Sequence, residues 1–305
     1  MRNAFARAMT ELAQKRDDIC LLSGDIGNRM FDRYKEVAPA RFFNCGIAEA
    51  NMMSMAAGMG LSGLRPVVYT ITPFTTTRCL EQIRTGVAYH ESPVVIVGTG
   101  SGLSYAELGA THHSLEDIAI LRSIPNIRVC APADATELVT QLKQAIDEGK
   151  PTYIRIGKKG EPNILESRND LGIGKAQLLK SGSKVLVLSI GPIISEALEA
   201  SNNLEKEGIS VAVANMGSIK PLDSSFLKQC VETGYKQWVS LEEHHKTGGL
   251  GTSILEWLSE NNADDIRLKR MGINDKFIHS LGTQDYVRKA EKINAEAIEK
   301  LIKSI

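Results

Sequence analysis

RFFNCGIAEANMMSMAAGMG, residues 41–60, joins three kinds of local structure in one short stretch. The aromatic and apolar residues from Arg41 to Cys45 predict a strand, and Gly46 predicts a turn. The small and apolar residues that run on to about Gly60 predict a helix. A strand that leads through a glycine turn into a helix is the unit from which parallel α/β sheets are built.

The same unit recurs on both sides of this stretch. Further strands are predicted at residues 19–22, 66–71, 93–98, 127–130 and 152–156. Helices are predicted at residues 73–89, 118–122 and 135–148, with Pro73 as a first helical residue and Ser114-Leu-Glu-Asp117 as a capping box. This alternation predicts a mostly parallel sheet with helices on both faces, and ligand sites beyond the carboxyl ends of its strands.

A second α/β unit follows a polar stretch that has no sustained periodicity. Its strands are predicted at residues 185–189, 209–214, 238–241 and 266–271, and its last helix at about 286–302. We therefore expect two α/β domains, each a mostly parallel sheet with helices on both faces. The expected boundaries are residues 1–160 for the first domain, a linker at 161–182, and residues 183–305 for the second.

Composition argues against several classes of function. The 305 residues include 36 Lys and Arg against 36 Asp and Glu, a balance that gives no support to a nucleic-acid or membrane-surface role. The apolar runs stay below the roughly 18 residues of a membrane span, and the N-terminus lacks a secretory-signal pattern. Five widely spaced cysteines in apolar segments indicate reduced thiols and a cytoplasmic protein: Cys20, Cys45, Cys79, Cys130 and Cys230.

Glu49 is a carboxylate in the first turn of a helix that is otherwise apolar. Met53 and Ala56 share its helix face by their spacing, so the glutamate is expected to be buried. A buried carboxylate is unfavourable unless it has a hydrogen-bond partner. Two interpretations stay open at this point: a helix-start carboxylate favoured by the helix dipole, and a catalytic group.

Several motifs carry a resemblance to a known family. GIAEANMMSMAAG at residues 46–58 resembles the G-I-A-E-Q-N-M pattern in the pyrimidine-binding domain of transketolases. EQIR at 81–84, GATHHSLEDIAILRSIPN at 109–126 and PTYIRIG at 151–157 follow in that family's order and spacing. EEHHKTGGLG at 242–251 is similar to the C-terminal domain of transketolases and deoxyxylulose-phosphate synthases. The resemblance therefore covers nearly the whole chain and points to the C-terminal section of a transketolase.

The resemblance implies a site for thiamine diphosphate. By matching, Glu49 hydrogen-bonds the N1′ atom of the cofactor's aminopyrimidine, which favours the imino tautomer that removes the C2 proton. Phe74 falls on the position of an aromatic residue that stacks on the aminopyrimidine. Ile71 stands at a second aromatic position, so the stacking surface is expected to be thinner. Asp25 aligns with an aspartate near the cofactor.

The same resemblance implies residues on the substrate side. His112 matches the histidine that contacts substrate oxygens, and no ligand-spaced cysteine accompanies it to support a metal site. Gly100 stands where transketolases usually carry a histidine. Leu108 stands where they carry an aspartate that recognises an acceptor hydroxyl, and leucine cannot accept a hydrogen bond. We therefore expect an acceptor that differs near its C2 carbon, such as a deoxy or branched sugar.

Three cations are candidates for binding an anionic sugar. Arg2 and Lys158 match family residues that bind the sugar phosphate, and Arg29 stands where the family often has serine. Arginine binds phosphate through paired donors. All three could equally be solvated surface charges. A phosphorylated or nucleotide-linked sugar is the substrate class that this pattern favours.

A full transketolase also has an N-terminal domain that holds the diphosphate through a metal ion. Its Gly-Asp-Gly signature is absent here, because position 26 is Ile, and no Asn-Asn pair follows at the right distance. The resemblance therefore implies a separate partner chain that supplies the ligands for Mg²⁺ (or Ca²⁺), in an α2β2 heterotetramer with the cofactor at the junction. The implied reaction transfers a two-carbon ketol unit from a ketose to an aldehyde.

Three alternatives stay open. Within enzymes they are the β-chain of a 2-oxoacid dehydrogenase's first component and a deoxyxylulose-phosphate-synthase-like enzyme. The third is a non-catalytic regulatory subunit that has kept the fold. The presence of Glu49, Phe74 and His112 together favours an enzyme over the last alternative.

Overall fold

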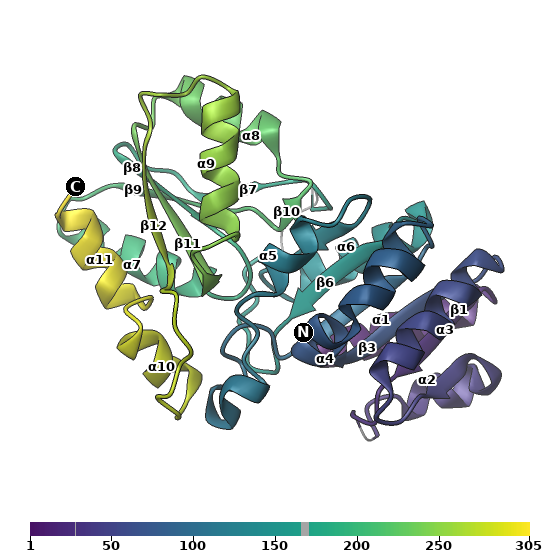
Figure 1. The fold of residues 1–305 in the computed structure, drawn as a ribbon. Helices are drawn as coiled ribbons and strands as arrows, with labels where there is room; N and C mark the ends of the chain where they lie inside the picture. Colours follow the sequence, from purple (N-terminus) through teal and green to yellow (C-terminus); the bar gives the residue numbers. More distant parts are fainter. Residues whose placement is uncertain (28, 166–170) are drawn as a thin grey trace.

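The computed structural model describes residues 1–27, 29–165 and 171–305, and they form two α/β domains, each built around one sheet (Figure 1). The first sheet has seven strands in the order β10-β5-β6-β4-β3-β1-β2. Its strands are β1 (Ile19–Ser23), β2 (Phe42–Asn44), β3 (Arg65–Ile71), β4 (Val95–Thr99), β5 (Arg128–Cys130), β6 (Thr152–Ile156) and β10 (Ser218–Lys220). All neighbours in this sheet are parallel except β10, which is antiparallel to β5.

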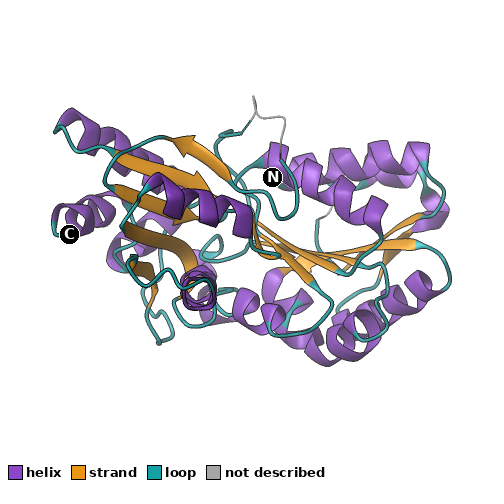
Figure 2. Ribbon diagram, turned by 90° about the horizontal axis from the view of Figure 1, so that it is seen from above, coloured by secondary structure: helices purple, strands orange, loops and turns teal. Residues whose placement is uncertain are grey.

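Helices cover both faces of the first sheet (Figure 2). They are α1 (Arg2–Lys15), α2 (Asp32–Val37), α3 (Glu49–Leu61), α4 (Thr72–Thr75), α5 (Asp117–Arg122) and α6 (Ala135–Glu148). Successive residues of a strand point to opposite faces, and both faces are buried here. Leu21 and Val67 pack with the residues of α1 and α6, whereas Leu22 and Val68 pack with those of α3 and α5.

The second sheet has five strands in the order β12-β11-β8-β9-β7. Its strands are β7 (Gln177–Lys180), β8 (Val185–Ser189), β9 (Val211–Asn215), β11 (Gln237–His245) and β12 (Arg267–Ile273), and its helices are α7 (Ile194–Lys206), α8 (Ser224–Thr233), α9 (Leu250–Glu260), α10 (Gln284–Ala290) and α11 (Ala295–Lys303). Among the strands described for this sheet, β7 alone pairs antiparallel, with β9. The predicted fold class, two mostly parallel sheets flanked by helices, is confirmed.

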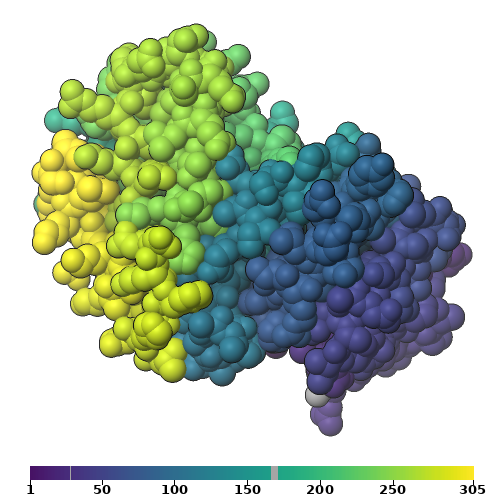
Figure 3. Space-filling view, viewed as in Figure 1, coloured from purple at the N-terminus to yellow at the C-terminus, as the bar shows by residue number. Residues whose placement is uncertain are grey.

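The two domains are interlocked rather than simply joined. Strand β10 follows β9 of the second domain along the chain, yet it pairs with β5 of the first sheet, with Ser218 opposite Cys130. In the space-filling view the green and yellow second domain lies directly against the teal and blue part of the first, on the face shown (Figure 3). Within the described residues, no helix combines the length and the apolar character that a membrane span requires.

The helix predicted at residues 73–89 is wrong as a single element. The chain forms α4, then a 3₁₀ turn at Thr77–Cys79, then a π-helix at Gln82–Ala88. The break lies in a run of threonines. The hydroxyls of Thr75 and Thr76 both donate to the carbonyl of Thr72. Such side-chain bonds compete with the regular backbone ladder.

Two other local predictions are also wrong. The capping box does not form, because the Asp117 carboxylate turns inward: it accepts a 2.6 Å hydrogen bond from the Tyr153 hydroxyl and pairs with Nε of Arg155 at 2.9 Å. The single helix predicted at about 286–302 is two helices, α10 and α11, and Lys292 between them has a left-handed φ of 59°.

Candidate functional site

Glu49 opens α3 and is only 5% exposed, as its place in an apolar helix predicts. Met53 and Ala56, on the same helix face, are fully buried. The carboxylate accepts a 2.9 Å hydrogen bond from Nη1 of Arg78. Glu49 therefore has the polar partner that a buried carboxylate needs, but that partner was not predicted.

Arg78 also lies against Phe74. The centre of its guanidinium is 4.1 Å from the centroid of the Phe74 ring, so this flat group lies between a ring face and the Glu49 carboxylate. The sequence held one signal for this contact, because Arg78 follows Phe74 by four residues in a stretch predicted to be helical. The arrangement shows that Glu49 and Phe74 together accommodate one planar group that carries N–H donors.

His112 extends this cluster. Its ring meets the Phe74 ring edge-on at 5.4 Å between centroids, and meets the Tyr105 ring at 5.8 Å. Its Nδ1 atom lies 2.9 Å from the Thr111 hydroxyl. Burial, assisted by the neighbouring His113, lowers the pKa of His112 below its ordinary value of 6.5. The imidazole is therefore neutral at pH 7, with one nitrogen able to donate and one able to accept.

Tyr105 fills the space that Gly100 leaves. A Cβ atom built on Gly100 would lie 2.0 Å from Cε2 of Tyr105, and the φ of Gly100 is +74°. The Nζ atom of Lys158 is 4.3 Å from the centroid of the Tyr105 ring and donates to Glu107 at 2.6 Å. Leu108, on the same loop, is 46% exposed. Tyr105 thus packs beside Gly100, at the position where transketolases usually carry a histidine. The sequence alone did not predict this role of Tyr105.

These contacts form one continuous chain at the carboxyl ends of β3, β4 and β6, where the topology predicts a site. Its members, in order of contact, are Glu49, Arg78, Phe74, His112, Tyr105 and Lys158. The structure therefore brings together four residues singled out from the sequence and adds Arg78 and Tyr105.

Three other predicted residues lie at or after the carboxyl ends of β1 and β3. Asp25 is exposed after β1 and accepts a 3.0 Å hydrogen bond from Asn44, whose own Oδ1 accepts from the Gly46 backbone, so Asp25 supports the turn before α3. Ile71 ends β3 and is almost fully buried. Arg29 is exposed, with a left-handed φ of 62°.

Arg2 begins α1 and is half-buried. Within the described part of the chain its Nε atom is buried and has no hydrogen-bond partner. Buried donors are normally satisfied, so an unmet guanidinium N–H suits an anionic ligand.

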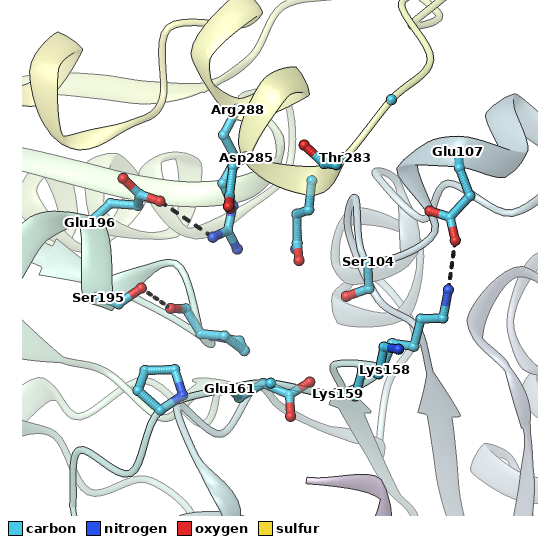
Figure 4. A pocket seen from close by; sticks show the side chains of 15 residues that line it. Ser104, Glu107, Lys158, Lys159, Glu161, Ser195, Glu196, Thr283, Asp285 and Arg288 are labelled. Atoms are coloured by element: carbon cyan, nitrogen blue, oxygen red, sulfur yellow. Dashed lines mark hydrogen bonds and ion pairs between the residues drawn. The ribbon is translucent and has the colours of Figure 1, made fainter.

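A cleft of about 810 Å³ lies between the two domains beside this cluster. Figure 4 shows Lys158 and Glu107 on its first-domain side, and Arg288 and Glu196 on its second-domain side. Two of the cations that line it are paired: Lys158 with Glu107, and Arg288 with Glu243 and, at 3.4 Å, with Glu196. Among residues 1–27, 29–165 and 171–305, no group of three or more His, Cys, Asp and Glu side chains could hold a metal ion.

Family models match both domains. The model described as "Transketolase, pyrimidine binding domain" matches residues 1–161, and the one described as "Transketolase, C-terminal domain" matches residues 174–298. The chain belongs to the transketolase family. Its site cluster lies in the part matched by the pyrimidine-binding domain.

Curated relatives extend this assignment. An apulose-4-phosphate transketolase subunit of Phocaeicola vulgatus is 34% identical over 278 residues, which is 90% of this chain and 88% of the relative. A 6-deoxy-6-sulfo-D-fructose transketolase subunit from a Clostridium species is 33% identical over 98% of this chain and 92% of its own length. A 1-deoxy-D-xylulose-5-phosphate synthase of Syntrophus aciditrophicus is 36% identical over 89% of this chain, but that match covers 42% of the synthase.

A solved structure has the same fold over almost its full length. A protein described as "Split gene transketolase, inactive beta4 tetramer" is 33% identical, with a TM-score of 0.91 over 99% of this chain and 97% of the other. This transketolase-family chain is therefore similar to a subunit of a split enzyme in both sequence and architecture.

Proposed function

We propose that this chain is the pyrimidine-binding subunit of a thiamine-diphosphate-dependent transketolase that transfers a two-carbon ketol unit from a ketose to an aldehyde. The observation that carries the proposal is the pairing of Glu49 and Phe74 around one flat group. The guanidinium of Arg78 stacks on the ring and donates to the carboxylate. An aminopyrimidine is also flat and needs a ring face on one side and a carboxyl group at its edge, so these residues fit it.

Each residue of the cluster then has a defined task. Glu49 accepts from Arg78 in this structure; toward the cofactor its carboxyl group would carry a proton and donate a hydrogen bond to the N1′ atom, and Phe74 would hold the ring plane. His112, beside Phe74, would donate a hydrogen bond to a substrate oxygen. It would also pass a proton to that oxygen and take it back during the reaction. When bound, thiamine diphosphate supplies an electron sink next to the substrate carbonyl carbon. Arg78 must leave, because it uses the ring face and the carboxylate that the aminopyrimidine needs.

A second chain completes the site in this proposal. The match to this chain spans 88% and 92% of the two relatives named as subunits, but only 42% of the synthase. We infer that a separate N-terminal-section subunit supplies the ligands of the diphosphate and of Mg²⁺ (or Ca²⁺), in an α2β2 assembly. The cytoplasmic location expected from the sequence stays a prediction.

The substrate is proposed to be an anionic sugar with an unusual acceptor. Arg2 offers an unmet buried donor, and Lys158 lies at the end of the contact chain, while Arg29 remains exposed after β1. Leu108 places a side chain without hydrogen-bonding atoms on the loop that also carries Gly100 and His112. The two relatives named as subunits carry apulose-4-phosphate and a sulfo-deoxy-fructose in their names, both of them anionic sugars.

The test is reconstitution with a candidate partner chain. Thiamine diphosphate binding is followed by calorimetry, and ketol transfer is assayed over a panel of phosphorylated, deoxy and branched sugars. Glu49→Gln should lower turnover by about a hundredfold or more, which is the usual contribution of a positioned acid–base group. Glu81→Gln, an exposed carboxylate, is the control.

An unchanged rate in Glu49→Gln would refute the proposed role of that residue. Partner and cofactor binding without turnover of any sugar would favour the regulatory-subunit alternative. Decarboxylation of a 2-oxoacid, without ketol transfer, would favour the dehydrogenase β-chain, and condensation of pyruvate with an aldehyde phosphate would favour the synthase-like enzyme.

A further inference from the structure

The loop that carries Gly100, Leu108 and His112 is anchored in the second domain. The apolar side chains of Leu103, Ala106 and Leu115 belong to the same buried cluster as strands β8, β9 and β11. The loop belongs to the first domain in sequence, but its core contacts are made with the second. Its geometry therefore depends on the domain that carries none of the predicted site residues.

Glu243, on β11, makes the central polar contact of this anchor. Its Oε1 atom accepts a 2.7 Å hydrogen bond from the backbone N–H of Leu103. The loop can come this close because residue 102 is glycine: a Cβ atom there would lie 2.4 Å from Glu243 Oε1. The same carboxylate accepts from Gln284 Nε2 at 2.9 and 3.1 Å and from Nε of Arg288. Glu243 is 7% exposed, so these bonds form away from bulk water.

The anchor holds both ends of the loop. Gly102 and Ser114 exchange two backbone hydrogen bonds, at 3.0 and 3.1 Å, and so close its base. The buried Arg155 donates through Nη2 to the carbonyl of Ser114 at 3.2 Å and to the carbonyl of Glu243 at 3.3 Å. The segment between these two points carries both Leu108 and His112.

We propose that Glu243 is a positioning residue for this loop and so fixes His112 relative to the substrate; this rests on the proposed function. The second domain then has a role in the reaction, because it sets the geometry of a group that it does not itself supply. A misplacement of about 1 Å can lower an enzymatic rate by roughly a hundredfold, so a change at the loop base should be measurable.

Glu242 is the matched control. It is the same residue type on the same strand and is fully buried. Its carboxylate accepts from the backbone N–H groups of Leu250 at 2.7 Å and Gly251 at 2.9 Å, at the start of α9. Glu242→Gln therefore perturbs a buried carboxylate within the second domain and leaves the loop contact of Glu243 in place.

The experiment compares Glu243→Gln, Glu242→Gln and Gly102→Ala in the assembled two-chain enzyme. Glu243→Gln should lower kcat/KM for the sugars by about tenfold to a hundredfold. The affinity and stoichiometry of thiamine diphosphate should stay within about twofold, because Glu49 and Phe74 lie outside this anchor. Gly102→Ala should have the same effect, since its Cβ pushes the loop away from an intact carboxylate. Glu242→Gln should behave like the unmodified enzyme.

Two results would overturn the inference. One is an equal loss of activity in Glu243→Gln and Glu242→Gln. The other is a loss of cofactor stoichiometry in proportion to activity, which indicates general destabilisation. Glu49→Gln, run in parallel, separates the two proposals: if it is inactive while Glu243→Gln is unaffected, the proposed function stands and the positioning role fails. If Glu49→Gln is fully active, the proposed function itself fails.

Discussion

Replacement of Arg78 with alanine should tighten the binding of thiamine diphosphate to the assembled enzyme. In the structure the Arg78 guanidinium lies 4.1 Å from the centroid of the Phe74 ring and donates to Glu49 at 2.9 Å. Both contacts must break before an aminopyrimidine can use the same ring face and carboxylate. The free energy of those contacts therefore opposes cofactor binding.

The size of the effect follows from the exposure of the pair. The Arg78 side chain is 45% exposed, so its ion pair is screened and contributes about 0.2–1 kcal/mol. Stacking of the guanidinium on Phe74 adds about 0.5–1 kcal/mol at such a site. The sum, about 0.7–2 kcal/mol, corresponds to a dissociation constant lowered roughly threefold to thirtyfold in the Arg78→Ala enzyme.

Calorimetric titration of the reconstituted enzyme with thiamine diphosphate measures this constant directly. Arg84→Ala is the control, because it removes the same charge from a neighbouring exposed site that contacts Glu81 only at 4.0 Å. Weaker binding in Arg78→Ala than in Arg84→Ala would refute the reasoning and show that Arg78 stabilises the bound cofactor. Equal affinity in the two variants would show that Arg78 leaves the site at no energetic cost.

Three further predictions concern other parts of the chain. Gly100→Ala should lower the free energy of unfolding by about 1–3 kcal/mol through its clash with Tyr105, and Tyr105→Ala in the same chain should recover part of the loss in urea unfolding. Burial raises the pKa of Glu137 from 4.5 to about 7, so the native state holds a proton that the unfolded chain has released. The free energy of unfolding should therefore fall as pH rises from about 4.5 to about 7, by up to about 1.4 kcal/mol per pH unit. Thermal melts of Glu137→Gln over the same pH range should show a weaker fall in stability. Leu108→Asp should raise kcat/KM for acceptors with a C2 hydroxyl by about tenfold or more. If the ratio of kcat/KM between acceptors with and without that hydroxyl stays the same, Leu108 does not take part in acceptor recognition.

Much of the fold could be predicted because its strands are buried on both faces. Continuous apolar runs such as Val185–Ser189 mark such strands without any tertiary information. The start of α3 at Glu49 was equally accessible, because a glycine turn and a run of small residues precede and form the helix. Strand β10 was not, since its three residues gain their partner, β5, only through the tertiary fold.

The site could be predicted only in part, for a similar reason. Glu49, Phe74 and His112 were found from motifs, and the structure places them in one chain of contacts. The position of the Arg78 side chain depends on how the helix after Phe74 breaks, and local helix propensity did not predict that break. Tyr105 fills the space beside Gly100 only once its loop has folded against the second domain.

The crossing of β10 into the first sheet bears on how this polypeptide can be subdivided. A fragment that ends near residue 161 would keep every catalytic candidate but lose the outermost strand beside β5. The backbone groups thereby uncovered would form an open edge, which invites association between copies. Family comparison divides the polypeptide into two modules, but the pairing of β10 with β5 joins both modules in one sheet.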